Sequence, residues 1–324
     1  MILVTGGAGY IGSHYVLYAH QKGEQLVVLD NLSYGHTEAL PKDVPLIVGE
    51  MGNRALLDDI FSSNKIDAVV HFAAYAYVGE SVTSPAKYYA NNTVATLAVL
   101  DAMRDYDVRH FVFSSTCATY GNPCYVPMDE KHPQNPINPY GESKYFVERI
   151  LKAYNHAYGL KYTALRYFNA AGADPNGFIG ESHDPETHLI PLIQQTAMGK
   201  RESISIFGTD YDTPDGTCIR DYIHILDLAQ AHALALDKLR SGSESSLYNL
   251  GCEQGYSVRE VIAACEKASD RTIPQTEMPR RAGDPPRLVA SAAKAKSELG
   301  WKPVYQDLEE IIRHAWNWET NRRY

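Results

Sequence analysis

A run of glycines close to the N-terminus constrains the fold more than any other feature of the sequence. The motif TGGAGYIG, residues 5–12, follows a short apolar segment and precedes a segment of helical length. Its glycines fit GxGxxG from Gly7 and the looser GxxGxxG from Gly6. Glycines allow a tight turn and a close backbone approach to a pyrophosphate, and the following helix directs its positive end at that anion. A strand–turn–helix unit of this kind predicts a dinucleotide-binding fold, although glycines also make ordinary turns.

An acidic residue at the end of the second expected strand indicates which dinucleotide binds. Asp30 closes the run VVLD, eighteen residues beyond Gly12. A carboxylate at this position accepts hydrogen bonds from the ribose hydroxyls and repels a 2′-phosphate. The chain continues with Asn31, Leu32 and Ser33, without an arginine that would receive such a phosphate. We therefore expect NAD as the cofactor rather than NADP.

Apolar runs alternate with segments of helical length through the first half of the chain. The expected strands are 2–4, 26–29, 46–48, 68–72, 110–113 and 162–167, and the expected helices are about 11–22, 53–63, 86–105 and 140–158. Several runs are apolar without alternation, as strands buried on both faces of a parallel sheet are. This order predicts an α/β fold with a Rossmann-type doubly wound parallel sheet.

The amino-acid composition of the chain changes after Phe168. Residues 170–187 are rich in glycine, proline, aspartate and asparagine, and a strand–helix unit returns at about 219–240. We expect a smaller mixed α/β lobe that grows out of the first unit by insertions. The two expected units are an NAD-binding Rossmann domain of residues 1–168 plus 219–250, and a substrate-binding lobe of residues 169–218 plus 251–324.

Composition and charge argue against several classes of protein. The chain of 324 residues has a formal net charge of -9, which disfavours a nucleic-acid partner. No apolar run approaches the roughly 18 residues that span a bilayer, and the N-terminus does not resemble a signal peptide. The five cysteines form no CxxC pair, which suits a reducing cytoplasm better than a disulfide framework or a zinc site. We therefore expect a cytoplasmic protein without a membrane partner or a metal.

The stretch NPYGESK, residues 138–144, holds a tyrosine one helical turn ahead of a lysine. Asn138 is a suitable N-cap and Pro139 a suitable first residue of a helix. Residues four apart share one face, which brings Lys144 near the phenol of Tyr140 and near the cofactor ribose. This cation and an oxidised nicotinamide would favour the phenolate, so that the tyrosine could act as a base. The alternative is a surface lysine beside a packing tyrosine.

A threonine ends the expected strand that contains FVFSST, residues 111–116. Thr116 lies where open α/β sheets place their sites, beyond the carboxyl end of a strand. Its hydroxyl could share a hydrogen bond with a substrate hydroxyl and with Tyr140. A threonine that merely finishes the strand is the alternative.

Together these motifs resemble the extended short-chain dehydrogenases/reductases. Further stretches are similar to the UDP-glucose 4-epimerase family: VGES (78–81), SSTCATYG (114–121), LRYFNAAGA (165–173), GTCIRDYIH (216–224) and PRRAGD (279–284). The resemblance runs nearly from end to end. It implies a tightly bound NAD and the interconversion of UDP-glucose and UDP-galactose by oxidation at C4, rotation of the 4-keto sugar and re-reduction.

The resemblance also implies a role for individual residues. Tyr140 would be the base, Lys144 would tune it and hold the ribose, and Thr116 would orient the sugar hydroxyl. The implied cofactor-binding residues are Gly6, Gly9, Tyr10, Ile11, Gly12, Asp30, Asn31, Glu50, Met51, Phe72, Ala73, Ala74, Asn91, Ser114, Tyr140, Lys144 and Tyr167. The implied substrate-binding residues are Thr116, Tyr140, Asn169, His188, Leu189, Arg220, Tyr222, Arg281, Asp284 and Leu288.

Three positions depart from the family pattern. Glu50 stands where an aspartate is common near the adenine, and Ala76 stands where some members have a lysine near the NAD phosphates. Leu288 replaces a tyrosine that narrows the sugar pocket in some members, so we expect N-acetylated UDP-hexosamines to be accepted as well. The helices at about 86–105 and 140–158 resemble the pair that forms a homodimer interface in the family.

Other functions remain open at this point. A UDP-xylose/UDP-arabinose 4-epimerase would use the same reacting groups, whereas a dehydratase would need an Asp-Glu pair where Cys117 and Ala118 follow Thr116. A non-catalytic NAD-binding sensor or scaffold would have little need of the complete Thr, Tyr and Lys set. A metal hydrolase is the weakest alternative, because HDPETH, residues 183–188, lacks the helical spacing of HExxH.

Overall fold

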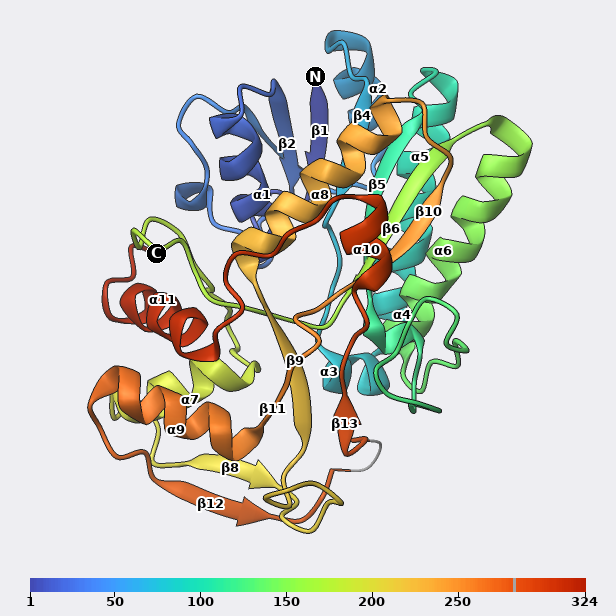
Figure 1. The fold of residues 1–324 in the computed structure, drawn as a ribbon. Coiled ribbons are helices and arrows are strands. Elements are labelled where there is room, and N and C mark those ends of the chain that lie inside the picture. The colour runs from blue at the N-terminus through green and yellow to red at the C-terminus, as the bar shows by residue number, and fades with distance from the viewer. Residues whose placement is uncertain (282–283) are drawn as a thin grey trace.

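Seven strands form one parallel sheet at the centre of the molecule (Figure 1). The computed structural model describes residues 1–281 and 284–324. From edge to edge the strands are β10 (Ser246–Leu250), β6 (Lys161–Tyr167), β5 (His110–Thr116), β4 (Ala68–His71), β1 (Ile2–Thr5), β2 (Leu26–Asp30) and β3 (Leu46–Val48). The direction of the strand order reverses between β1 and β4, as in a doubly wound sheet. The predicted fold class is confirmed.

Helices cover both faces of this sheet. One face carries α1 (Tyr10–Gln21) and α8 (Ile225–Arg240), and the other carries α2 (Arg54–Ser63), α5 (Thr96–Asp105) and α6 (Pro139–Tyr158). Successive residues of a strand point to opposite faces, so Ile2 and Val4 contribute to the first core and Leu3 to the second. The inner strands β1 and β4 are buried along their whole length because each borders two cores.

The helix expected at about 86–105 consists of three parts. They are α4 (Pro85–Tyr88), the π-helical segment η2 (Tyr89–Ala95) and α5. Within η2, the Oδ1 of Asn92 accepts a hydrogen bond from the Tyr75 N–H at 2.9 Å, and its Nδ2 donates to the Tyr75 carbonyl at 2.9 Å. A wider turn of helix thus holds the loop that follows β4, and π-helical turns of this kind are frequent at functional sites.

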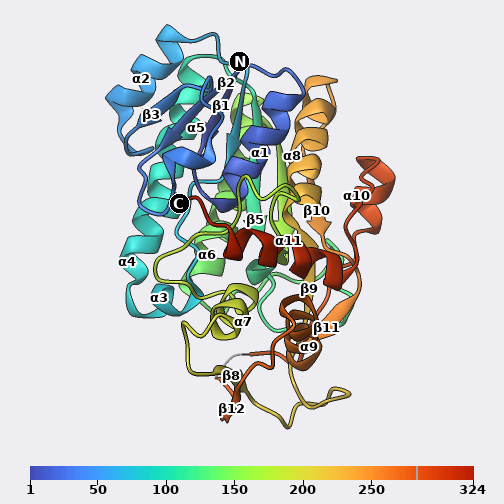
Figure 2. The ribbon, with the colours of Figure 1, turned by 90° about the vertical axis from the view of Figure 1, so that its left-hand side faces the viewer.

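A smaller unit lies below the carboxyl ends of the large sheet (Figure 2). Its strand β9 (Ile219–His224) pairs with β7 (Asn169–Ala171), β11 (Gly255–Ser257) and β13 (Arg287–Leu288), and β8 (Ile204–Phe207) pairs with β12 (Gln275–Met278). Three helices share one apolar core here: α7 (Leu189–Ala197), α9 (Val258–Ser269) and α11 (Leu308–Thr320). The strand–helix unit expected at about 219–240 is present as β9 and α8, but β9 joins this smaller sheet.

The remaining short elements connect these parts. They are η1 (Thr37–Ala39), α3 (Val78–Thr83), η3 (Cys117–Thr119) and α10 (Ala293–Glu298). All five cysteines are free thiols, so the fold is held without disulfides. Among the described residues, no helix combines the length and the apolar composition that a bilayer crossing requires.

A buried ion pair fixes α6 against the sheet. From β6, Arg166 donates to both oxygens of Glu148 on α6, with Nε–Oε1 at 2.9 Å and Nη2–Oε2 at 2.6 Å. The third contact of this guanidinium is the Tyr120 hydroxyl at 2.9 Å, and that hydroxyl donates to Asn249 on β10. Loss of one partner would leave the other as an uncompensated buried charge, at a cost of about 3–5 kcal/mol. The position of α6 over β5 and β6 is therefore well determined.

Candidate active site

A cleft of about 1330 Å³ runs along the carboxyl ends of the parallel strands, between the large sheet and the smaller unit. Its walls include the loops that follow β1 to β6, together with α7 and β13. Open α/β sheets bind their ligands at this edge. With one exception, Ser114, every residue that the sequence predicts for the cofactor or the substrate lines this one cleft.

The glycine turn forms a narrow cradle at one end of the cleft. Gly6 has a φ of 71°, and a Cβ on it would lie 2.4 Å from the Ala73 nitrogen. A Cβ on Gly12 would lie 2.1 Å from the Gly6 carbonyl oxygen, so the turn closes onto α1 only with glycine at both positions. No side chain within the described ranges caps the first turn of α1, which begins at Tyr10 behind Gly9. The free N–H groups of this helix end therefore suit a pyrophosphate.

The acidic residue after β2 is held by the same turn. Asp30 accepts a hydrogen bond from the Ala8 N–H at 2.9 Å and from the Leu32 N–H at 2.8 Å. Burial raises the pKa of this carboxyl, while the hydrogen bonds from the backbone act in the opposite direction. Beside it, the Asn31 amide donates to both carboxylate oxygens of Glu50 at 3.2 and 3.3 Å. The ribose-binding and adenine-side residues predicted from the sequence are thus neighbours.

Further predicted cofactor residues continue this wall. They are Ile11, Met51, Phe72, Ala73, Ala74, Asn91 and Tyr167. Ser114 instead lies buried behind the wall, where its hydroxyl is hydrogen-bonded to His232 Nε2 at 2.8 Å. Its carbonyl accepts a hydrogen bond from Lys144 at 2.9 Å, so this residue positions a cleft residue without lining the cleft itself.

The tyrosine and the lysine of NPYGESK lie in the first turns of α6. The predicted N-cap is confirmed, because Asn138 Oδ1 accepts a hydrogen bond from the Gly141 N–H at 2.8 Å. A Cβ on Gly141 would lie 2.5 Å from the Ala118 carbonyl oxygen, so a glycine here lets the helix approach the loop after β5. This close approach brings Tyr140 and Lys144 to the end of β5.

Burial dominates the ionisation of both side chains. It lowers the pKa of Lys144 to about 7, and the Nζ atom lies 4.9 Å from the centroid of the Phe113 ring. It raises the pKa of Tyr140 to about 12, while a hydrogen bond with Thr116 acts in the opposite direction. The low phenol pKa expected from the sequence is therefore not a property of these protein groups by themselves.

Two arginines approach the cleft from the smaller unit. Arg220 on β9 lies 3.4 Å from Asp284, measured between Nη2 and Oδ1. The guanidinium of Arg281 lies 3.7 Å from the centroid of the Phe207 ring. Both arginines were predicted from PRRAGD and GTCIRDYIH. Residues 282 and 283 of the first motif lie outside the described residues.

The other predicted substrate residues surround these arginines. Asn169 donates to the Asp221 carbonyl at 2.9 Å, and burial raises the pKa of Tyr222. His188 precedes α7 and Leu189 begins it, while Leu288 lies on β13. All of them line the cleft together with Thr116 and Tyr140.

Several residues of the cleft were not predicted. Tyr34 and Tyr77 line it with ring centroids 5.2 Å apart, and Tyr75 lies 5.7 Å from Tyr34. None of these three tyrosines belongs to a motif with a fixed spacing, so the sequence gives no signal for them. Glu181, His183 and Glu186 also line the cleft. His183 and Glu186 occur in HDPETH, and the potential metal ligands gathered in this short stretch were a signal that the sequence offered.

Comparison with known proteins gives one consistent family. Residues 2–251 match the NAD dependent epimerase/dehydratase family. The chain is 54% identical to the UDP-glucose 4-epimerase of Halalkalibacterium halodurans, over 98% of this chain and 95% of that protein. A crystal structure of UDP-glucose 4-epimerase from Brucella ovis in complex with NAD superimposes with a TM-score of 0.95 at 48% identity, covering 98% of both chains. The UDP-Glc/GlcNAc 4-epimerase of Campylobacter jejuni superimposes with a TM-score of 0.87 at 42% identity, covering 99% of both chains.

The buried amine should make stability depend on pH. Lys144 has a folded pKa of about 7, below the ordinary lysine value of about 10.4, so between these pH values the unfolded chain binds a proton that the folded chain does not. Stability therefore rises with pH across this window, by up to about 1.4 kcal/mol per pH unit. We expect Lys144→Met to remove this rise in urea unfolding at pH 7, 8 and 9 of protein freed of bound nucleotide.

A matched substitution on the same helix provides the control. Lys152 is exposed on α6, so Lys152→Met should retain the pH dependence of the wild type. Parallel stability curves for the wild type and Lys144→Met would contradict the assignment of a buried, largely neutral amine.

Proposed function

Because this chain belongs to the NAD dependent epimerase/dehydratase family, we propose that it interconverts UDP-glucose and UDP-galactose with a resident NAD. The observation that carries the proposal is the convergence of two predicted sets of residues on one cleft. The glycine turn and Asp30 form one end, and Tyr140, Lys144 and Thr116 lie at the end of β5. A binding protein without catalysis would not require the second set.

The proposed reaction oxidises and then re-reduces carbon C4 of the sugar. Tyr140 takes the proton of the 4-hydroxyl in the first half and returns a proton to the 4-keto oxygen in the second half. Thr116 orients that hydroxyl toward the phenol. NAD, when bound, supplies the acceptor and later the donor of the C4 hydride.

The ionisation of Tyr140 requires positive charge close to it. Burial raises its pKa to about 12 against the opposing effect of a hydrogen bond with Thr116, and at this pKa the phenol is neutral. Lys144 is one helical turn away, and protonation of its amine would favour the phenolate. Because the Ser114 carbonyl fixes Nζ at 2.9 Å, this charge has a defined position. We propose that Lys144 also holds the cofactor ribose.

The diphosphate and the uracil would fix the substrate while the sugar turns. Arg220 and Arg281 provide guanidinium groups that suit phosphate oxygens. The remaining proposed substrate residues are Asn169, His188, Leu189, Tyr222, Asp284 and Leu288. Rotation of the 4-keto sugar about its diphosphate link would then present its second face without release of the nucleotide.

We propose that the two parts of the chain predicted from the sequence bind the two ligands separately. Residues 1–168 plus 219–250 would bind NAD, and residues 169–218 plus 251–324 would bind the UDP-sugar. The large sheet and its helices support the first assignment, and the cleft-facing position of α7 and β13 supports the second. Strand β9 is an exception to this division, because it pairs with β7, β11 and β13 and carries Arg220 and Tyr222, which we propose as substrate residues.

A panel of UDP-sugars tests the reaction and its range. Purified protein without added NAD should convert UDP-glucose to UDP-galactose, and from either side the mixture should reach the same ratio. We expect UDP-N-acetylglucosamine to be converted as well, because Leu288 leaves room beside the sugar. Products are identified by chromatography against standards.

The controls separate the competing functions. Leu288→Tyr should reduce the conversion of the N-acetylated sugar and retain that of UDP-glucose, whereas Leu288→Met, which conserves volume, should retain both. Stoichiometric reduction of NAD would indicate a dehydrogenase, and no conversion at all would indicate a sensor. Conversion of UDP-xylose alone would indicate the pentose enzyme.

We further propose that the protein is a homodimer that uses η2 and α6. Their outer surface carries apolar side chains: Val94 is 65% exposed, Phe146 is 36% exposed, and the Phe146 ring lies 6.0 Å from that of Tyr89. Apolar surface of this kind is stabilised when a partner covers it.

A pair of matched substitutions tests the dimer. Val94→Asp would place a charge in the proposed interface, so we expect the wild type at twice the chain mass of 36.1 kDa and this variant at one chain mass in light scattering. Val304 is 67% exposed on another part of the surface, and Val304→Asp should remain a dimer. A monomeric wild type would reject the proposal.

We propose the cytoplasm as the location of the protein. Five free thiols suit a reducing compartment. Recovery of the protein with secreted proteins after cell fractionation would contradict this.

A further inference from the structure

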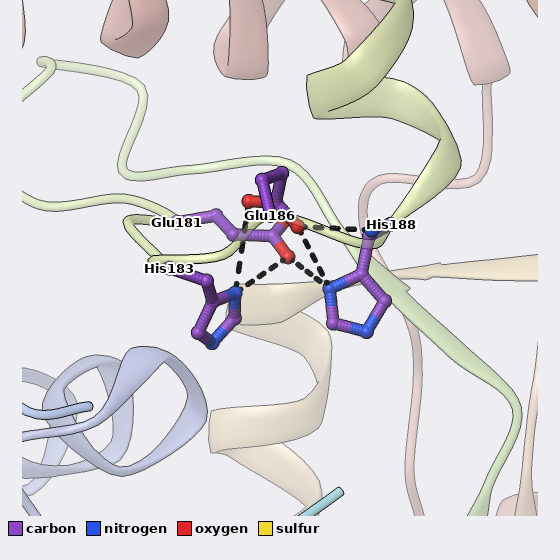
Figure 3. A group of neighbouring side chains, drawn as sticks. All are labelled: Glu181, His183, Glu186 and His188. Carbon is purple, nitrogen blue, oxygen red and sulfur yellow. Dashed lines mark hydrogen bonds and ion pairs between the residues drawn. The ribbon is translucent and has the colours of Figure 1, made fainter. Parts of the chain in front are cut away.

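A second group of ionisable side chains lines the cleft on the side of α7. It consists of two glutamates and two histidines from one loop, and we call it the His–Glu cluster: Glu181, His183, Glu186 and His188 (Figure 3). Figure 3 shows both imidazole rings directing a nitrogen toward the two carboxylates. One ligand-type atom from each of the four side chains lies within 4.8 Å of all the others.

The spacing of these atoms fits a single metal ion. The His183 Nδ1 atom lies 3.2 Å from a Glu181 oxygen and 3.7 Å from a Glu186 oxygen. The His188 Nδ1 atom lies 2.6 Å and 3.4 Å from oxygens of the same two carboxylates. Four tetrahedral bonds of about 2.0–2.1 Å place neighbouring ligand atoms about 3.3 Å apart. The observed distances lie on both sides of this value, so adjustments of less than about 1 Å complete the geometry.

The four side chains meet as close His–Glu contacts and make no hydrogen bond of regular geometry to one another. Glu181 Oε1, His183 Nδ1 and Glu186 Oε2 are buried, and among the described residues their only polar contacts are the close approaches within the cluster. Glu181 is 7% exposed, and the Glu186 side chain is 4% exposed. A buried polar atom without a partner costs about 1–3 kcal/mol, and each such atom in a folded protein therefore needs an explanation. Lone pairs that converge on one point explain all three together.

Hydrogen bonds outside the His–Glu contacts hold the loop that carries the cluster. Glu186 Oε1 accepts hydrogen bonds from the Thr187 N–H at 2.7 Å and the His188 N–H at 2.9 Å. The indole N–H of Trp318 on α11 donates to the Glu181 carbonyl at 2.8 Å. On the other side, His36 Nε2 is hydrogen-bonded to the Ser182 carbonyl at 3.0 Å. These contacts orient the carboxylates before any ion binds, as the outer contacts of metal sites do.

We propose that the His–Glu cluster binds one divalent transition-metal ion of the zinc class. Two imidazoles with two carboxylates suit zinc and its neighbours in the first transition row, whereas magnesium and calcium prefer oxygen ligands alone. Two carboxylates and two neutral imidazoles balance the double positive charge of the ion. The inference does not depend on the proposed reaction, because the ion takes no part in proton or hydride transfer. His188 is the one ligand that also belongs to the proposed substrate residues.

Because of the position of the cluster, a bound ion would affect the wall of the cleft. His188 is the last residue before α7 and its side chain is 48% exposed to the cleft. A bound ion would therefore join the start of α7 to residues 181–186 and stiffen the substrate-side wall.

Zinc titration of the whole protein tests the proposal. The protein is treated with EDTA, dialysed, and titrated with Zn²⁺ in competition with a chromophoric chelator. We expect one ion per chain for the wild type and a loss of affinity of more than about 100-fold for His183→Ala, because outer contacts alone are worth up to about this factor. Co²⁺ should give the visible absorption of a tetrahedral site in the wild type and not in this variant.

Two further variants keep the test decisive. His20 forms a surface pair with Asp43, with Nε2–Oδ2 at 2.8 Å, so His20→Ala should bind Zn²⁺ as the wild type does. Glu186→Gln conserves shape and removes a charged ligand, so it should lose affinity even if His183→Ala fails to fold. Equal Zn²⁺ affinities of Glu186→Gln and His20→Ala, or less than one ion per wild-type chain, would overturn the proposal in favour of two ion pairs with protonated histidines.

Discussion

The hydrogen bond from Lys144 to the Ser114 carbonyl is the contact on which the rest of the site depends. It joins the first turns of α6 to the end of β5, and these two elements carry Tyr140 and Thr116. The amine is buried, and burial destabilises its protonated form. A nearby negative charge would stabilise that form. A phenolate at Tyr140 would provide that charge. We propose that the same burial that destabilises the ammonium couples it to the phenol of Tyr140.

Much of the large sheet could be predicted because its signals are local. Apolar runs gave the strands, Asn138 and Pro139 marked the start of α6, and the glycine turn marked the start of α1. Long-range contacts were not predictable in this way. Asn92 of the π-helical segment makes two hydrogen bonds with Tyr75, seventeen residues earlier in the chain, and β9 pairs with strands far apart in the chain.

The candidate site shows the same difference between local signals and long-range contacts. Residues within motifs of fixed spacing converged on the cleft, whereas Ser114 lies behind it, because only the fold shows which atom of a residue faces the ligand. As metal ligands, the residues of HDPETH were set aside in the sequence because a loop has no regular spacing, and only His188 was predicted for another role, in substrate binding. Folding of that loop nevertheless brings His183 and His188 within 3.7 Å of the same carboxylates. Ligand-type residues in a loop can therefore form a compact site that no helical pattern reveals.

The central claim is that the Tyr140 phenol moves the proton of the sugar 4-hydroxyl. Turnover of UDP-glucose by Tyr140→Phe tests it most directly, since this change removes one oxygen atom and keeps the ring. The account predicts a loss of turnover of about 10²–10⁴-fold, the usual contribution of a positioned acid–base group, with NAD still bound. Turnover at the wild-type rate would contradict it.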